Sequence, residues 1–238
     1  KRVTIKNNQA GGNGGGGIFI GNSTAFLDSV IIARNTSEAQ GGGIRVSGTS
    51  SVTVNRSELS NNSSAIAGGN FFGEPGTGSY FTHCTTYMGE IYLQGHYELG
   101  TVANFDNSIL WGSLIHIEPY TGVSLSYTLL QGGEDGVTGD VSGSSFSNVI
   151  DEDPLFVDTE SDNYHISTNS PCIDTGDPGS PLDPDNTRAD MGAYYYHQIS
   201  TYEGPIWHVA IDGSDETGDG SSEYPFLSIQ YADQHSVV

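Results

Sequence analysis

The chain has 238 residues, with 29 acidic side chains against seven Lys and Arg, and a formal net charge of −22. Such acidity disfavours nucleic acid, anionic membranes and anionic polysaccharides, because these are bound through cationic side chains. It favours Ca²⁺ and neutral or cationic partners. Two cysteines are too few for a disulfide framework, and no apolar run approaches the roughly 18 residues that predict a membrane span.

Two short phrases recur along the first part of the chain. GGGIFI at 15–20 returns as GGGIRV at 41–46, and LDSVIIARN at 27–35 returns as VNRSELSNN at 54–62. Such a period fits one coil of a β-solenoid and is too short for a globular domain. Further copies of the second phrase, at shifts of 27, 24 and 20 residues, begin at Phe81, Phe105 and Leu125.

Alternating apolar residues bounded by Gly and Asn predict short strands within each copy. Stacked copies place small side chains in one inner row and mostly aliphatic side chains in another. The small row is Val30, Ser57, Cys84, Ser108 and Thr128, and the aliphatic row is Ile32, Leu59, Thr86, Leu110 and Leu130. We therefore predict an all-β fold, a right-handed single-stranded parallel β-helix, its hand following from the rule for parallel crossovers.

Three asparagines, Asn8, Asn35 and Asn62, recur at intervals of 27 residues. We expect them to occupy the left-handed turn conformation that Asn tolerates and to form a structural ladder of hydrogen bonds from coil to coil. The glycine triplets permit tight corners between strands, since glycine adopts positive φ without a Cβ clash.

Three motifs follow the coils in order: IDEDPLFVD at 150–158, YHISTNSPCIDTG at 164–176 and DPDNTRADMGAYYY at 183–196. Together they resemble the closing segment of bacterial parallel β-helix proteins of the choice-of-anchor Q type, and the coils resemble the PbH1 repeats of those proteins. The resemblance covers residues 1–196 and implies a secreted, extracellular or cell-surface protein. It leaves enzymatic activity open, because related β-helices include polysaccharide lyases.

The last part of the chain resembles an N-terminal segment, although it follows the three closing motifs. IWHVAIDGSDETGDGSSEYPFLSIQYA at 206–232 is similar to the opening segment of such β-helix proteins. The resemblance implies tandem units, or a terminal part that joins the next subunit; alternatively, the segment packs back on its own chain as a cap. We divide the chain into β-helix coils (1–148), the closing segment (149–198) and a C-terminal cap or start of a following unit (199–238).

Catalysis on this fold draws on two residue classes. Polysaccharide lyases need a Lys or Arg base, and Arg34 and Arg56 are expected on neighbouring rungs, although nearby carboxylates can neutralise them. Glycoside hydrolases use paired carboxylates, but no hydrolase motif is present. The cationic candidates are Lys1, Lys6, Arg34, Arg45 and Arg56, and the acidic candidates are Glu90, Glu98, Asp106 and Glu118.

Aromatic side chains in the later coils are candidates for stacking on the rings of a neutral glycan. The candidate carbohydrate-binding residues are Tyr92, Tyr97, Trp111 and Tyr120. The two cysteines, Cys84 and Cys172, are expected to be buried, reduced thiols.

Acidic loops near the C-terminus are candidates for structural Ca²⁺, because Asp-rich turns with Gly supply oxygen ligands. The same carboxylates can cap turns without an ion. No histidine spacing predicts a transition-metal site, and no other cofactor is expected. The candidate calcium residues are Asp183, Asp185, Asp190, Asp212, Asp215 and Asp219.

The first rung, at residues 1–8, has no preceding capping segment in the sequence. A bare rung presents unpaired backbone groups that another chain can pair with. We expect a non-catalytic scaffold or adhesive surface that self-associates head to tail through its terminal rungs. The rival hypothesis is a carbohydrate-active enzyme or glycan-binding module.

Overall fold

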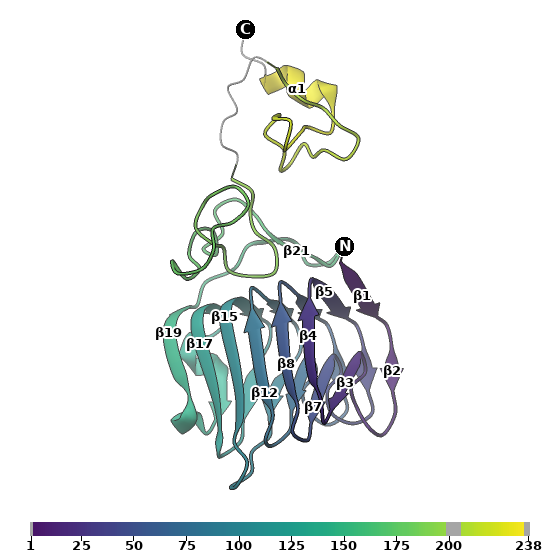
Figure 1. Cartoon of the computed structure of the whole chain (residues 1–238), viewed down its shortest axis with the longest axis vertical. Coiled ribbons are helices and arrows are strands. Elements are labelled where there is room, and N and C mark those ends of the chain that lie inside the picture. The colour runs from purple at the N-terminus through teal and green to yellow at the C-terminus, as the bar shows by residue number, and fades with distance from the viewer. Residues whose placement is uncertain (1, 199–205, 236–238) are drawn as a thin grey trace. The chain divides into compact units, whose positions relative to one another are not determined.

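The computed structural model describes residues 2–198 and 206–235. It confirms the predicted parallel β-helix, in which strands of successive coils lie side by side (Figure 1). The chain divides into two compact units. The solenoid unit comprises Lys1–Pro181 with Arg188–Tyr196, and the C-terminal unit comprises Leu182–Thr187 with His197–Val238.

Four walls enclose the solenoid core, and each coil adds a strand to several of them. The open wall consists of β4 (Thr24–Asp28), β8 (Ser51–Asn55), β12 (Gly78–Thr82) and the first halves of β15 (Thr101–Trp111), β17 (Thr121–Leu130) and β19 (Ser145–Ile150). The covered wall consists of β1 (Val3–Lys6), β5 (Val30–Ala33), β9 (Glu58–Ser60), β13 (Thr85–Tyr87) and the second halves of β15, β17 and β19.

The remaining two walls are narrower. The aromatic wall consists of β3 (Ile18–Gly21), β7 (Ile44–Ser47), β11 (Phe71–Gly73), β14 (Ile91–Leu93), β16 (Ile115–Ile117) and β18 (Val137–Gly139). The short wall consists of β2 (Gln9–Ala10), β6 (Thr36–Ser37) and β10 (Ser63–Ser64). Two 3-10 turns, η1 (Gly133–Gly136) and η2 (Val141–Gly143), belong to the last coil.

The strand register is the one that the repeats predict. Phe81 pairs with Val54 on one side and Phe105 on the other, and the rings of the two phenylalanines stack at 4.5 Å between centroids. Burial of each such side chain contributes about 2 kcal/mol. The full inner row runs Leu27, Val54, Phe81, Phe105, Leu125 and Phe146, one coil further than the copies found by sequence comparison.

Left-handed residues turn the chain at two corners of every coil. One column separates the open and covered walls, at φ between 44° and 57°: Ser29, Arg56, His83, Asn107, Tyr127 and Asn148. Because this corner interrupts the strand ladder, the next residue bonds to a hydroxyl instead. The N–H of Val30 donates to Ser57 Oγ at 3.0 Å, and that of Cys84 donates to Ser108 Oγ at 3.1 Å. The small inner row therefore stabilises the corner.

The second column corrects the predicted conformation of the asparagine ladder. The left-handed residues are Asn7, Arg34 and Asn61, each one position before the ladder residue. The prediction was wrong by one residue, because a side chain at the left-handed position points out of the corner. The ladder side chains point inward, where Asn35 and Asn62 are buried.

The closing segment packs over the covered wall and runs back along the coils, as Figure 1 shows for the part that contains β21. Strands β20 (Phe156–Asp158) and β21 (Asn163–Ile166) pair antiparallel. A second hydrophobic cluster forms between wall and segment. Its buried members are Ile109 and Leu129 from the wall and Ile166, Cys172 and Met191 from the segment.

The C-terminal unit is small and centred on Phe226, which is 2% exposed. Phe226 pairs with Val209 in a parallel bridge and stacks on Trp207 at 5.8 Å between ring centroids. Helix α1 (Ile229–His235) follows. With seven residues it is too short to cross a bilayer, and no other helix in the described ranges is long and apolar enough to do so.

Candidate functional site

The asparagine ladder joins the first three coils through side-chain amides. Asn8 Nδ2 donates to Asn35 Oδ1 at 2.9 Å, and Asn35 Nδ2 donates to Asn62 Oδ1 at 3.0 Å. The backbone N–H groups of Asn8 and Asn35 donate to the same two oxygens. Each amide oxygen thus accepts from the preceding coil. Within the described residues, no donor reaches Asn8 Oδ1, so the ladder ends in an open acceptor.

The first rung has strand neighbours on one side only. Strands β1, β2, β3 and β4 each pair with a single strand of the next coil. In β1, the N–H of Val3 donates to the Ser29 carbonyl in the next coil at 3.2 Å. Because backbone direction alternates along a strand, the N–H and C=O of Thr4 and Lys6 face the open side. Among the described residues, these backbone groups have no strand partner.

Most of the candidate lyase cations are held by carboxylates. Lys6 Nζ and Arg34 Nη2 lie 2.7 and 2.6 Å from the carboxylate oxygens of Asp162 in the closing segment. Hydrogen bonds from Arg34, with a further contribution from Lys6, lower the pKa of Asp162 to about 2. Arg45 is paired with Glu74, and Lys1 lies outside the described residues. These side chains neutralise internal acids and are poorly suited to act as bases.

The sequence suggested that Arg34 and Arg56 occupy equivalent positions on neighbouring rungs. In the structure they lie at different corners of the coil. The register pairs Ala33 with Ser60 and Asp28 with Asn55. Arg56 therefore stands at the corner before the covered wall, whereas Arg34 stands at the corner after it. The 27-residue shift between the two phrases gives the same result, since it aligns Arg56 with Ser29 and Arg34 with Asn61.

The candidate hydrolase carboxylates are divided between walls. Glu118, at the end of the aromatic wall, accepts a hydrogen bond from Tyr92 Oη at 2.5 Å and another from the N–H of Gly95. Glu90 accepts from the N–H of Gly68. Asp106 instead lies on the outer side of the open wall, where partial burial and the nearby Asp177 raise its pKa. Asp106 is thus separated from Glu118, whereas Glu118 and Glu90 both lie near Tyr92, whose pKa is raised to about 12 by burial and by these two carboxylates.

A buried acid joins the solenoid to the closing segment. Glu58 is 2% exposed and accepts hydrogen bonds of 2.6 Å from Ser60 Oγ and from Tyr194 Oη. Burial raises the pKa of Glu58, although these hydrogen bonds oppose the rise. The guanidinium of Arg2 lies over the ring of Tyr194, 4.2 Å from its centroid. The sequence gives no signal for this contact, since Glu58 and Tyr194 are 136 residues apart.

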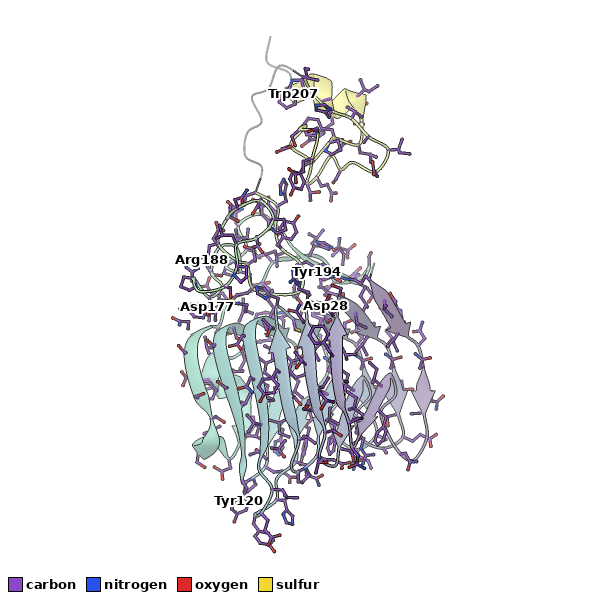
Figure 2. All side chains as sticks on the ribbon, viewed as in Figure 1. Asp28, Tyr120, Asp177, Arg188, Tyr194 and Trp207 are labelled. Atoms are coloured by element: carbon purple, nitrogen blue, oxygen red, sulfur yellow. The ribbon has the colours of Figure 1, made fainter. Side chains whose placement is uncertain are left out.

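The predicted carbohydrate-binding aromatics are not brought together. Trp111 packs against the second hydrophobic cluster. Tyr92 stacks between Phe72 and His116, with centroid distances of 5.6 and 4.8 Å, so both of its faces are used. Tyr97 and Tyr120 are exposed, and Tyr120 lies in a loop at the edge of the coils away from Tyr194 and Arg188 (Figure 2).

Three of the predicted calcium carboxylates in the C-terminal unit, those of Asp185, Asp215 and Asp219, cap turns of that unit. Asp185 accepts from Thr187 and from the N–H of Gln198, and Asp215 accepts from the N–H groups of Leu227 and Ser228. Asp219 accepts from the N–H of Ser221, the N–H of Asp183 donates to the carbonyl of Thr187, and Asp212 is exposed in a turn.

In the solenoid unit, Asp190 accepts from the N–H groups of Asp174 and Tyr196. Among the described residues, no group of three or more His, Cys, Asp or Glu side chains is placed to hold a metal ion. Structural Ca²⁺ stays a prediction that this geometry does not support.

Comparisons with known proteins do not assign the chain to a family. No protein-family model matches, and no curated protein is similar enough to be matched. Among solved structures, the crystal structure of the pectate lyase Pel9A is similar, with 11% identity and a TM-score of 0.33 over 75% of this chain and 70% of that one. The pairing of its own strands defines the chain as a parallel β-helix, and the choice-of-anchor Q type stays a resemblance.

Proposed function

We propose that the chain is a non-catalytic β-helix scaffold that associates end to end through its first rung. The open edge of β1 to β4 carries this proposal. Unpaired backbone groups of an edge strand favour addition of another strand. The last coil of another copy of this chain, whose β18 and β19 each pair with one strand, would supply such strands.

Two further features support continuation of the stack at this edge. Asn8 Oδ1 is oriented as an acceptor for a ladder amide from a preceding coil, as Asn35 and Asn62 accept from theirs. The core side chains of the first rung, such as Ile5 and Leu27, are only partly buried. A further coil would complete their burial, and each side chain would contribute roughly 1 kcal/mol.

Two observations on the candidate catalytic residues support the absence of catalysis: two of the cations are paired with an acid, and two of the carboxylates are separated. Lys6 and Arg34 are paired with Asp162, and the carboxylates of Asp106 and Glu118 lie on different walls. A secreted or cell-surface location remains part of this proposal.

Sedimentation velocity over a series of protein concentrations tests the association. The informative variant is Thr4→Pro, which removes an N–H on the open side of β1 and leaves the bond from Val3 in place. Thr4→Ala is the matched control, since it retains the N–H. We expect oligomers that grow with concentration for the wild type and for Thr4→Ala, and a monomer for Thr4→Pro with an unchanged circular dichroism spectrum. A wild-type chain that stays monomeric at the highest attainable concentration would contradict the proposal.

A further inference from the structure

Two exposed aromatic rings lie in line on the open wall. Phe26 on β4 and Tyr80 on β12 occupy the same outward column, with Thr53 of β8 between them. Phe26 is 67% exposed and Tyr80 is 51% exposed. The adjacent Leu27 and Phe81 pack into the core, so strand alternation directs both rings outward.

The spacing and orientation of these rings form a platform. Neighbouring strands lie about 4.8 Å apart, so two rungs separate the rings by about 9.5 Å. A Cβ atom on Gly78 would lie 3.8 Å from Tyr80 Cε2, which shows that the Tyr80 ring leans along the strand over this glycine. In Figure 1 the strands of the open wall lie side by side towards the viewer, and no other part of the solenoid unit crosses them.

Neutral hydrogen-bonding side chains surround the two rings. They are hydroxyl and amide groups on the outer side of the open wall: Ser51, Thr53, Asn55, Thr82, Asn104 and Ser124. The outward residues of this wall include Asp28 and Asp106 but no Lys or Arg. An anionic ligand would find no counter-charge on these strands and only Arg56 at the corner after β8, whereas the hydroxyls of a neutral ligand would find donors and acceptors along the wall.

We propose that the open wall binds an extended neutral polysaccharide whose sugar rings stack on Phe26 and Tyr80. The apolar face of a sugar ring packs on an aromatic ring, and its hydroxyls bond to the neighbouring amides and hydroxyls. In an extended, equatorially linked chain, alternate sugar rings present the same face, at a separation close to that of the two side chains. The site is distinct from the first rung, so this inference goes beyond the proposed scaffold function.

Binding to insoluble cellulose and chitin, measured by depletion of protein from solution, tests the inference. The double variant Phe26→Ala/Tyr80→Ala removes both rings, and the matched control Phe19→Ala/Leu114→Ala removes two exposed apolar side chains from other parts of the solenoid unit. We expect the wild type to bind at least one of the two polysaccharides. The association constant of the first variant should fall on the order of tenfold or more, because each ring gives up a few tens of Å² of apolar contact; the control should bind like the wild type.

Polygalacturonate serves as the anionic probe, and we expect no binding to it. The inference is overturned if the wild type binds neither cellulose nor chitin, if it prefers polygalacturonate, or if the two double variants bind equally. It is also overturned if loss of Phe26 and Tyr80 dissociates oligomers, since the open wall would then be an interface between copies. The Thr4→Pro variant should retain polysaccharide binding, which separates this site from the first rung.

Discussion

The substitution Asn35→Ala probes the ladder at its most buried point. The Asn35 side chain accepts hydrogen bonds from the N–H and Nδ2 of Asn8 and donates to the carbonyl of Ile5 and to Asn62 Oδ1. Alanine leaves the Asn8 N–H and the Ile5 carbonyl without these partners. A lost hydrogen bond costs about 1 kcal/mol and a buried unpaired group about 1 to 3 kcal/mol, so we expect unfolding to become easier by about 3 kcal/mol.

Urea unfolding followed by far-UV circular dichroism measures this change, with Asn8→Ala as the reference. Asn8 is exposed, and alanine keeps the backbone N–H that donates to Asn35 Oδ1, so only the bond from Asn8 Nδ2 is lost and the cost should be below about 1 kcal/mol. If the free energies of unfolding of the two variants agree to within about 0.5 kcal/mol, the ladder does not stabilise the coils through its buried amides.

Two further predictions concern ionisable groups. Asp162 has its pKa lowered to about 2 by Arg34 and Lys6, so its carboxylate stabilises the fold above the unfolded-state pKa of about 3.9 and loses this effect as the pH falls towards 2. Asp162→Asn should therefore be less stable than the wild type at pH 6, by about 1 kcal/mol after solvent screening, and equally stable at pH 2. Thermal unfolding of both proteins at the two pH values measures this difference. A difference in stability that is the same at both pH values contradicts the expectation. Burial raises the pKa of the Cys84 and Cys172 thiols to about 12. Iodoacetamide at pH 8 should modify them only in urea, and mass spectrometry that finds rapid labelling without denaturant would refute this burial.

The sequence predicted the coil register because the repeat carries it at every rung. Val54 and Phe81 were aligned by phrase similarity, and they pair in the structure. The expectation that Arg34 and Arg56 occupy equivalent positions was wrong, because the 27-residue register already aligns Arg34 with Asn61 and Arg56 with Ser29. Asn35 was correctly predicted in the ladder, but its conformation depends on the direction of the side chain, which composition does not reveal.

The contacts that the closing segment makes could not be predicted from the sequence. Trp111 was predicted to bind sugars, yet it packs in the second cluster, because the segment that covers it carries no repeat and hence no register. Phe26 and Tyr80 could have been found. They are 54 residues apart in the sequence, twice the 27-residue period, and each precedes an inner residue of the aligned row.

The closing segment has a consequence for how the solenoid unfolds. In an uncovered solenoid each coil contacts only its neighbours, so end coils can fray one at a time. Here Asp162 binds Arg34, the N–H of Ala193 donates to Thr85 Oγ1, and that of Gly192 donates to the Asn107 carbonyl, which ties successive coils to one segment. The coils should therefore melt together. An inserted or deleted coil would shift these partners by about 4.8 Å. The contacts of the closing segment therefore form fully only when the solenoid has the correct number of coils.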